Sequence, residues 1–249
     1  MEEWRREAYR LHARSRNYLA RLEESRWIIR EALKHMNHPY VAFSCGKDSS
    51  TLAHLVLEER PDVPLRFLSS GETRIVHNVD EIISWFRARG AIVEEILVDR
   101  VWSEEWQDAT WDEERKAGRG DLEKLNAGDY DGVFMGLRAQ ESNRRKMSLY
   151  QNQTPGLPAF CYKYKAGRRE GMIRCCPLAR WQVEDVGAYL LTHGIPVLRQ
   201  YELHGLEART TARLTGDAVR QNILSDIKRD NPEGWRKLLK RFPEFSHFV

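Results

Sequence analysis

The sequence has no apolar run long enough to cross a membrane, and its first residues, Met-Glu-Glu-Trp-Arg-Arg, lack the apolar core of a signal peptide. These absences predict a cytoplasmic protein without membrane association. Cysteine is scarce, with 4 residues at positions 45, 161, 175 and 176, too few for the disulfide framework of a secreted domain. Because Cys175 and Cys176 are adjacent, a bond between them is disfavoured, and we expect four reduced thiols.

An excess of one charge is also missing. The formal net charge is +3 over 249 residues, so any argument for an anionic partner has to rest on local clusters. No internal repeat or low-complexity linker is present. Hydrophobic residues make up 41% and charged residues 31%, which is the composition of a globular domain with a sizeable core.

Strand and helix patterns alternate along the middle of the chain. The expected strands are 40–43, 63–69, 91–98 and 133–136, and the expected helices lie within 1–36, 52–60, 80–89, 183–193 and 210–249. Short strands that alternate with helices imply right-handed crossovers and a parallel sheet. We therefore expect an α/β fold with an open, mostly parallel sheet flanked by helices and with helical additions at both ends.

Two segments are expected to lie outside this regular pattern. Residues 101–131, with Trp102, Trp106 and Trp111, predict an irregular helical excursion in which the tryptophans anchor packing. The N-terminal helices carry apolar stripes, which favour packing on the domain over an interface to another subunit. A homo-oligomer stays open.

One strand-to-helix turn carries the residues from which the expected chemistry starts. It is rich in small residues, namely Ser44, Gly46, Ser49 and Ser50. Small side chains let backbone N–H groups approach an anion, and the N-terminus of the next helix adds its dipole and unpaired donors. Lys47 adds a mobile cation, and the Asp48 carboxylate suits a divalent metal such as Mg²⁺. The turn predicts a cradle for a pyrophosphate group.

Two common phosphate-binding motifs are absent from this turn. A Walker A loop needs an earlier Gly and then Gly-Lys-Ser/Thr, but here Gly46-Lys47 is followed by Asp48 and no earlier Gly is in place. The dinucleotide fingerprint needs three glycines, and the turn has Gly46 alone. The cradle therefore belongs to another class, with an ordinary polar turn as the alternative.

A second group of polar residues follows the strand at 133–136. It contains Arg138, Glu141, Ser142, Arg144 and Arg145. The carboxyl ends of parallel strands form the edge at which open α/β sheets bind ligands, and arginine forks onto phosphate or sulfate oxygens. This edge predicts an anion site, whereas a solvated basic helix start is the alternative.

The segment 138–180 is strongly basic. It has ten basic residues against two acidic ones, with Tyr150, Phe160, Tyr162 and Tyr164 interleaved. Prolines and glycines between 155 and 167 predict loops or a hairpin. A basic, aromatic surface suits a nucleic-acid strand, and it equally suits the entrance for one small anionic substrate.

Three stretches resemble the phosphoadenosine phosphosulfate (PAPS) reductase family of the PP-loop ATP pyrophosphatases. Residues 44–49 resemble the Ser-Gly-Gly-x-Asp-Ser loop of that class, with Cys45 where the first Gly usually stands. Residues 136–145 (Gly-Leu-Arg-x-x-Glu-Ser-x-x-Arg) resemble a second signature, and residues 177–190 (Pro-Leu-x-x-Trp-x-x-x-Asp-Val-x-x-Tyr-Leu) a third. The resemblance covers 38–202 in matching order.

This resemblance implies a Rossmann-like fold that binds an adenine nucleotide, with ATP and Mg²⁺ as cofactors. The residues expected in the nucleotide site are Ser44, Cys45, Gly46, Lys47, Asp48, Ser49, Ser50, Gly71, Gly136, Arg138, Glu141, Arg144 and Arg145. Lys47, Asp48 and Arg138 are the expected catalytic groups, with Asp48 also the metal ligand. We expect a single domain over 1–249, made of a helical extension (1–37), a nucleotide-binding core (38–202) and a C-terminal helical segment (203–249).

The resemblance leaves three activities open. Reductases that release sulfite from PAPS or adenosine phosphosulfate carry a cysteine on the C-terminal tail or a later Cys-x-x-Cys, and neither follows Cys176 here. Cleavage of ATP to AMP and pyrophosphate, which activates an acceptor for sulfur transfer, is the preferred activity. Relatives of that kind thiolate tRNA or serve DNA phosphorothioation, which implies a nucleic-acid acceptor and a sulfur donor such as a cysteine desulfurase. A non-catalytic nucleotide-binding subunit is the third possibility.

The cysteines bear on the path of sulfur. Cys45 lies near a helix N-terminus and Lys47, which predicts a lowered thiol pKa. Cys175 and Cys176 are the expected catalytic thiols of a sulfur relay, ahead of Cys161. Together these three also allow an iron–sulfur cluster, which we do not favour, and a buried structural role is the alternative for each.

Overall fold

The protein is described by a computed structural model that covers residues 2–69, 71–98, 124–126, 128–167, 169–208 and 222–249. The tryptophans Trp102, Trp106 and Trp111 lie outside the described residues, as do Arg168 and the start of the C-terminal segment at 210–221. The predictions made for those positions therefore stay predictions.

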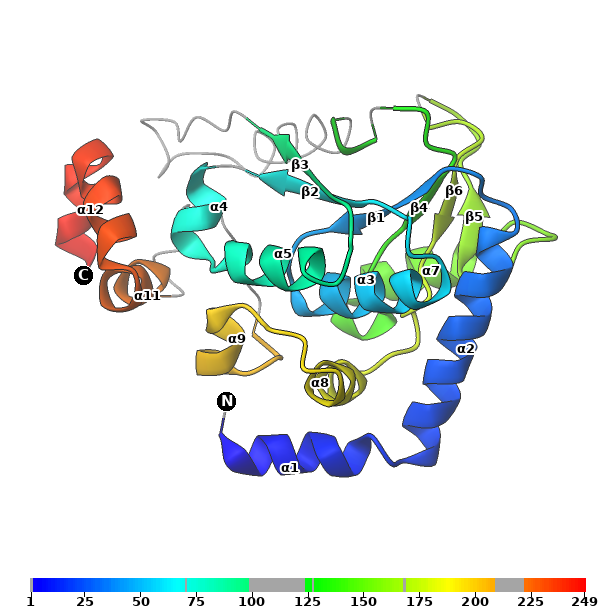
Figure 1. Ribbon diagram of the computed structural model, residues 1–249, viewed down its shortest axis with the longest axis horizontal. Helices are drawn as coiled ribbons and strands as arrows, with labels where there is room; N and C mark the ends of the chain where they lie inside the picture. The colour runs from blue at the N-terminus through cyan, green and yellow to red at the C-terminus, as the bar shows by residue number, and fades with distance from the viewer. Residues whose placement is uncertain (1, 70, 99–123, 127, 168, 209–221) are drawn as a thin grey trace.

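A six-stranded sheet forms the centre of the molecule (Figure 1). Its strands are β1 (Pro39–Phe43), β2 (Leu65–Ser69), β3 (Val93–Leu97), β4 (Gly132–Phe134), β5 (Cys161–Lys163) and β6 (Ile173–Cys175). The order is β3-β2-β1-β4-β6-β5, and every neighbouring pair is parallel except β5 with β6. The predicted open, mostly parallel α/β sheet is confirmed, and the predicted hairpin is the β5–β6 pair.

β1 occupies the middle of the parallel part, between β2 and β4. Its residues are apolar and almost all buried, as expected for a strand covered on both faces. Because β1, β2 and β4 run in the same direction, the loops after β1 and β4 emerge at the same edge. This arrangement brings two segments together that are far apart in the sequence.

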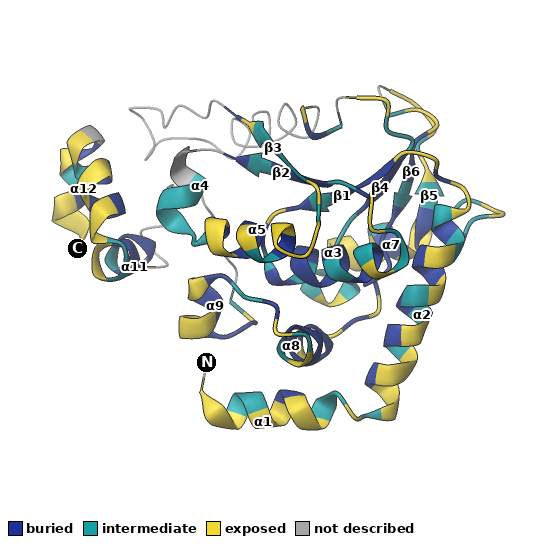
Figure 2. Ribbon diagram, viewed as in Figure 1, coloured by how far each residue is buried: buried dark blue, intermediate teal, exposed yellow. Residues whose placement is uncertain are grey.

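Helices α3 (Lys47–Glu59), α5 (Val79–Arg87) and α8 (Val183–Thr192) lie on one side of the sheet in Figure 1. Leu52, Leu55 and Val56 of α3 are fully buried. Figure 2 shows this inner layer in dark blue, with exposed surface on the outer helices. The short helices α4 (Gly71–Val76), η1 (Ala139–Glu141), α7 (Asn143–Gln151) and α9 (Arg199–His204) connect the remaining parts.

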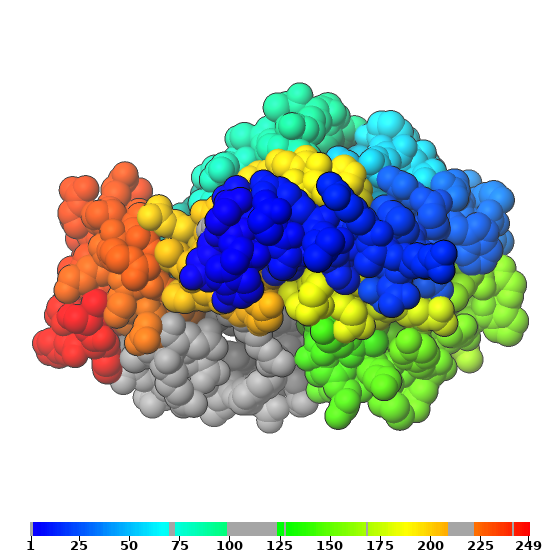
Figure 3. Space-filling view, turned by 90° about the horizontal axis from the view of Figure 1, so that it is seen from below, coloured from blue at the N-terminus to red at the C-terminus, as the bar shows by residue number. Residues whose placement is uncertain are grey.

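The N-terminal extension forms two helices, α1 (Glu3–His12) and α2 (Arg16–Leu33). Seen from below, they lie across the yellow segment that contains α8 (Figure 3). The Tyr9 ring of α1 packs so tightly on Gly187 of α8 that a Cβ there would lie 2.5 Å from a ring carbon. The expected packing on the domain is therefore present, although two apolar residues of α1, Trp4 and Leu11, are exposed.

The C-terminal segment forms α11 (Ile223–Asp230), α12 (Pro232–Arg241) and η2 (Pro243–Phe248). These elements build a small apolar cluster of their own, which includes Leu238 and Phe245 and contacts Ile75 and Val76 of α4. Within 222–249 the expected helical segment is therefore a packed pair of helices followed by a short 3-10 helix.

Aromatic and basic residues of the segment 138–180 pair with one another. Arg174 lies over the Tyr162 ring at 4.1 Å, and Arg169 lies over the Tyr164 ring at 4.4 Å. These cation–π contacts occupy ring faces that a nucleic-acid base would otherwise stack on.

Candidate functional site

The turn between β1 and α3 is closed by its own serines. Ser44 N–H donates to Ser49 Oγ at 3.2 Å, and the Ser49 hydroxyl donates to the Gly46 carbonyl at 3.0 Å. Gly46 is the N-cap of α3, and its carbonyl accepts the Ser50 N–H at 2.9 Å. These bonds hold the turn around the first residues of α3, where the helix carries its positive dipole end.

Cys45 adopts a left-handed backbone conformation, with φ at 57°. Glycine takes this conformation without a steric penalty, whereas a residue with a Cβ is strained there. The local backbone thus explains why glycine usually stands at this position of the motif. The Cys45 side chain is 1% exposed and belongs to the main apolar core.

The prediction of a lowered pKa for Cys45 is wrong. Burial, with a smaller contribution from the Glu95 carboxylate, raises the pKa of the Cys45 thiol well above its ordinary value. The left-handed turn directs the side chain into the core, where burial decides the pKa of the thiol.

Asp48 links the two loops of the sheet edge. Its Oδ1 accepts a hydrogen bond from Arg138 Nε at 2.6 Å, and its Oδ2 lies 3.0 Å from Lys47 Nζ. Arg138 is 4% exposed and Lys47 is 8% exposed, so both cations are largely shielded from water. The three expected catalytic groups therefore form one cluster with two positive charges and one negative charge.

Arg138 is held from both sides. Its Nη1 donates to Gln140 Oε1 at 2.6 Å, and its backbone N–H donates to Glu141 Oε2 at 2.9 Å. Gln140 Oε1 also accepts the Val183 N–H at the start of α8, at 2.8 Å. The guanidinium is thereby positioned before any ligand arrives, which lowers the cost of binding an anion.

Gly136 lets the two loops approach each other. A Cβ at this position would lie 2.9 Å from the carbonyl carbon and oxygen of Asp48 and 3.1 Å from Ser49 N. These neighbours are backbone atoms and have little room to move. A side chain here would separate the β4 loop from the turn that begins α3.

A cavity of about 980 Å³ opens over this cluster. The predicted site residues that line it are Ser44, Gly46, Lys47, Asp48, Ser49, Gly136, Arg138, Glu141 and Arg145. Its size lies at the upper end of the range for small-molecule sites and accommodates a nucleotide. The two motifs recognised in the sequence thus share one cavity.

Several predicted site residues do not line this cavity. They are Cys45, Ser50, Arg144, Cys175 and Cys176. Ser50 faces the interior at 1% exposure, and Gly71 begins α4. Arg144 is exposed on α7.

The structure does not support the predicted relay through Cys175 and Cys176. Both side chains are fully buried, and none of the four cysteines forms a disulfide. Burial raises the pKa of Cys176 to about 12. Burial and a hydrogen bond with Cys161 raise the pKa of Cys175 well above its ordinary value. A reactive thiolate needs an exposed, electropositive setting, and these thiols have none.

Among the cavity residues that the sequence interpretation missed are Tyr201, Gln140 and His77. Tyr201 places its ring 5.0 Å from Lys47 Nζ, a cation–π contact that orients the lysine. Gln140 lies inside the second motif, at a position that the motif leaves open. His77 also lines the cavity. Its Nδ1 is buried and has no hydrogen-bond partner among the described residues. No local pattern marks His77, because its place depends on how α4 packs.

The donor set at Asp48 fits Mg²⁺, which proteins bind through one or two carboxylates together with substrate phosphates. The carboxylate forms ion pairs with Lys47 and Arg138 in the structure. Both cations would be free to bind phosphate oxygens when a metal binds Asp48. Iron–sulfur ligation fits less well. Cys161, Cys175 and Cys176 are sealed in the apolar core, and each thiol would have to be deprotonated there.

Within the described parts of the chain, no helix is both long and apolar enough to cross a membrane.

Comparisons with known proteins identify curated relatives that cover most of this chain. Sulfate adenylyltransferase subunit 2 of Agrobacterium fabrum is 28% identical over 198 residues, covering 70% of this chain and 60% of that protein. The protein of the same name from Rhizobium etli is 29% identical over 203 residues, covering 72% of this chain and 62% of that protein. The chain thus spans about three fifths of the length of these relatives.

Among solved structures, the U34-tRNA thiolase NcsA from Methanococcus maripaludis with its 4Fe–4S cluster is similar at a TM-score of 0.47 and 12% identity. The similarity covers 93% of this chain and 80% of that one.

Residues 38–206 match the family described as the phosphoadenosine phosphosulfate reductase domain. The match spans both loops of the cavity and more than half of the chain. The chain therefore belongs to the PAPS reductase family of the PP-loop proteins.

Proposed function

We propose that the protein binds ATP in the cavity at the sheet edge and cleaves it between the α- and β-phosphates. An acceptor oxygen attacks the α-phosphorus, the bond from that phosphorus to the bridging oxygen breaks, and pyrophosphate leaves with the electron pair. The acceptor carries the adenylyl group after this step. The observation that carries the proposal is the Lys47–Asp48–Arg138 cluster at the N-terminus of α3.

The residues of the cluster suit different parts of this reaction. The backbone donors that begin α3 and the Lys47 ammonium face the charge that develops on the leaving pyrophosphate. Arg138 stabilises the phosphate oxygens nearer the β4 loop. Asp48 would hold Mg²⁺, which supplies further neutralisation of the phosphates when bound.

For the acceptor we favour a small oxyanion of the sulfate class, because the curated relatives are named sulfate adenylyltransferase subunit 2. That name also favours assembly with a second subunit. A nucleic-acid acceptor, DNA or tRNA activated for sulfur transfer, is the second candidate, since the segment 138–180 is strongly basic. The arginine–tyrosine pairs of that segment weaken the nucleic-acid candidate.

The test incubates the purified chain with Mg²⁺ and ATP labelled in the α-phosphate, with sulfate, tRNA or DNA as acceptor. Release of pyrophosphate with label in AMP or in an adenylylated acceptor supports the proposal, and the acceptor that stimulates release identifies the substrate class. ADP as the labelled product would overturn it. Release of sulfite from PAPS with reduced thioredoxin would instead support a reductase.

A further inference from the structure

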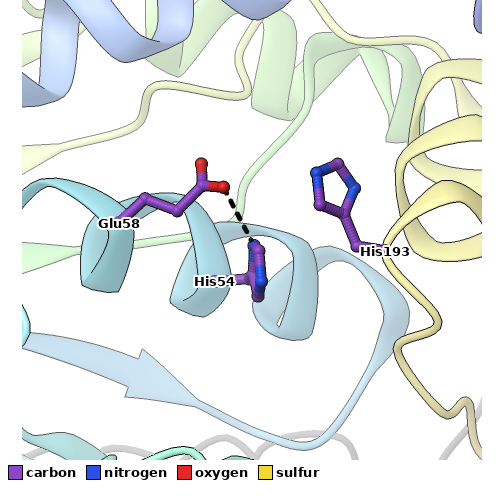
Figure 4. Close-up of side chains that lie close together, drawn as sticks. All are labelled: His54, Glu58 and His193. Atoms are coloured by element: carbon purple, nitrogen blue, oxygen red, sulfur yellow. Dashed lines mark ion pairs between the residues drawn. The ribbon is translucent and has the colours of Figure 1, made fainter.

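The far end of α3 carries a second group of potential ligands, separate from the cavity. His54 and Glu58 lie one helical turn apart and therefore project from the same face of α3. His193 comes from the C-terminal cap of α8 and points toward them (Figure 4). One donor atom from each residue lies within 4.8 Å of the others, and the described residues contain no second group of three or more such donors.

Neighbouring contacts orient these side chains. His193 Nδ1 lies 2.8 Å from the Tyr189 carbonyl oxygen, to which it donates its proton, and this tautomer leaves a lone pair on Nε2. The His193 ring also stacks on the Tyr189 ring with 4.0 Å between the ring centroids. The imidazole is thus fixed by its second nitrogen, as is usual for histidines that bind metals.

The other two donors share a hydroxyl group. Tyr189 Oη lies 2.8 Å from His54 Nδ1 and 3.3 Å from Glu58 Oε2. Glu58 Oε1 lies 3.8 Å from His54 Nδ1. When His54 Nδ1 binds a cation, the hydroxyl can donate to Glu58 alone and hold that carboxylate in place.

We propose that His54, Glu58 and His193 bind one divalent transition-metal ion of the zinc type, with water as the fourth ligand. Two imidazoles and one carboxylate form a donor set that zinc accepts in tetrahedral geometry. Bonds of about 2.1 Å place tetrahedral donors about 3.4 Å apart. The donors here lie within 4.8 Å of one another, so side-chain movements of roughly 1 Å bring them to this tetrahedral spacing.

Such an ion would join α3 to α8. The site is distinct from the phosphate cradle, because Asp48 and His54 are roughly 9 Å apart along the helix at 1.5 Å per residue. Arg26 competes for the same carboxylate, since its Nη2 lies 3.3 Å from Glu58 Oε2. Because the ion would lie between α3 and α8 and away from the cradle, it acts as a cross-link between these helices and takes no part in the attack on phosphorus.

The experiment titrates chelator-treated protein with Zn²⁺ and with Co²⁺. We expect one equivalent to bind by calorimetry, and Zn²⁺ at about 100 times its dissociation constant should raise the folding equilibrium constant about 100-fold. Bound Co²⁺ should show the visible bands of tetrahedral nitrogen and oxygen ligation. His193→Gln and Glu58→Gln should each lose the bound equivalent.

His204→Gln is the matched control. It removes a histidine that also contacts a carboxylate, with Nε2 at 2.8 Å from Asp226 Oδ2, but that pair has no second histidine. This variant should bind Zn²⁺ like the original chain. Absence of a bound equivalent in the original chain would overturn the proposal, as would binding that survives in Glu58→Gln and His193→Gln. A thiolate-to-cobalt charge-transfer band would assign the metal to the cysteines instead.

Discussion

Replacing Asp48 with asparagine should separate two roles of this carboxylate. Asp48 forms ion pairs with Lys47 at 3.0 Å and with Arg138 at 2.6 Å when no ligand is bound. The same charge repels a phosphate that arrives without a metal. Two unit charges about 5 Å apart interact by about 3 kcal/mol at an effective dielectric of 20. Asp48→Asn should therefore bind pyrophosphate more tightly in the absence of Mg²⁺, by about 10- to 100-fold once solvent screening is included.

Catalysis should change in the opposite direction. Without the carboxylate the cluster loses its expected Mg²⁺ ligand, so ATP cleavage should fall by at least about 100-fold. Calorimetry with pyrophosphate, with and without Mg²⁺, measures the first effect, and pyrophosphate release from ATP measures the second. Weaker binding of pyrophosphate by Asp48→Asn without Mg²⁺, or unchanged turnover, would refute the reasoning.

The matched control is Asp185→Asn. Asp185 is also a buried carboxylate with a cationic partner, since its Oδ1 accepts from Arg21 Nη2 at 2.8 Å and lies 2.7 Å from His12 Nε2. It does not line the cavity. Breaking either buried pair should cost about 3 kcal/mol or more of stability. Both variants should therefore lower Tm, while Asp48→Asn alone changes the affinity for pyrophosphate.

Three further changes test other parts of the site. Gly136→Ala places a Cβ 2.9 Å from the Asp48 carbonyl and should weaken nucleotide binding by about 10- to 100-fold through a cost of about 1–3 kcal/mol, measured by calorimetry. Burial lowers the pKa of His77 from 6.5 to about 4. As pH falls, the unfolded chain therefore binds the proton before the folded chain does. The free energy of unfolding should be constant above pH 6.5 and should decrease by up to roughly 3 kcal/mol as pH drops to 4. Denaturant titrations across that range should show His77→Gln losing this part of the decline. Cys45→Gly should retain ATP cleavage within about threefold, because relief of the left-handed strain offsets lost burial of the thiol.

The sequence predicted that the two polar segments after the strands would meet at one edge of the sheet, because this depends only on the parallel direction of the strands. Residues 40–43 and 133–136 read as parallel strands, so the groups after them were expected at one edge, and Asp48 and Arg138 do meet there. The direct contact between them was beyond prediction. It depends on the close approach at Gly136, which is a property of the packed backbone.

The errors concern side-chain direction. Cys45 is close to Lys47 along the chain, and that proximity suggested an activated thiol. The left-handed φ of 57° turns the side chain into the core, where burial has the opposite effect on its pKa. Burial likewise raises the pKa of Cys175, which lies on β6 opposite Cys161 and inside the core. Proximity along the sequence therefore did not predict the reactivity of these thiols, because burial of the side chains determines their pKa.

α8 connects the cavity to the proposed metal site. At its start, the Val183 N–H donates to Gln140 Oε1, which also accepts from Arg138. At its end, His193 lies beside the side chains of α3. Asp48 lies in the first turn of α3, which packs on α8. Arg138 is linked to the start of α8 through Gln140. Both partners of the Asp48–Arg138 contact are therefore supported by α8. A metal ion between α3 and α8 would therefore stiffen the support of both loops, and its effect on nucleotide affinity would reach the cavity through packed helices.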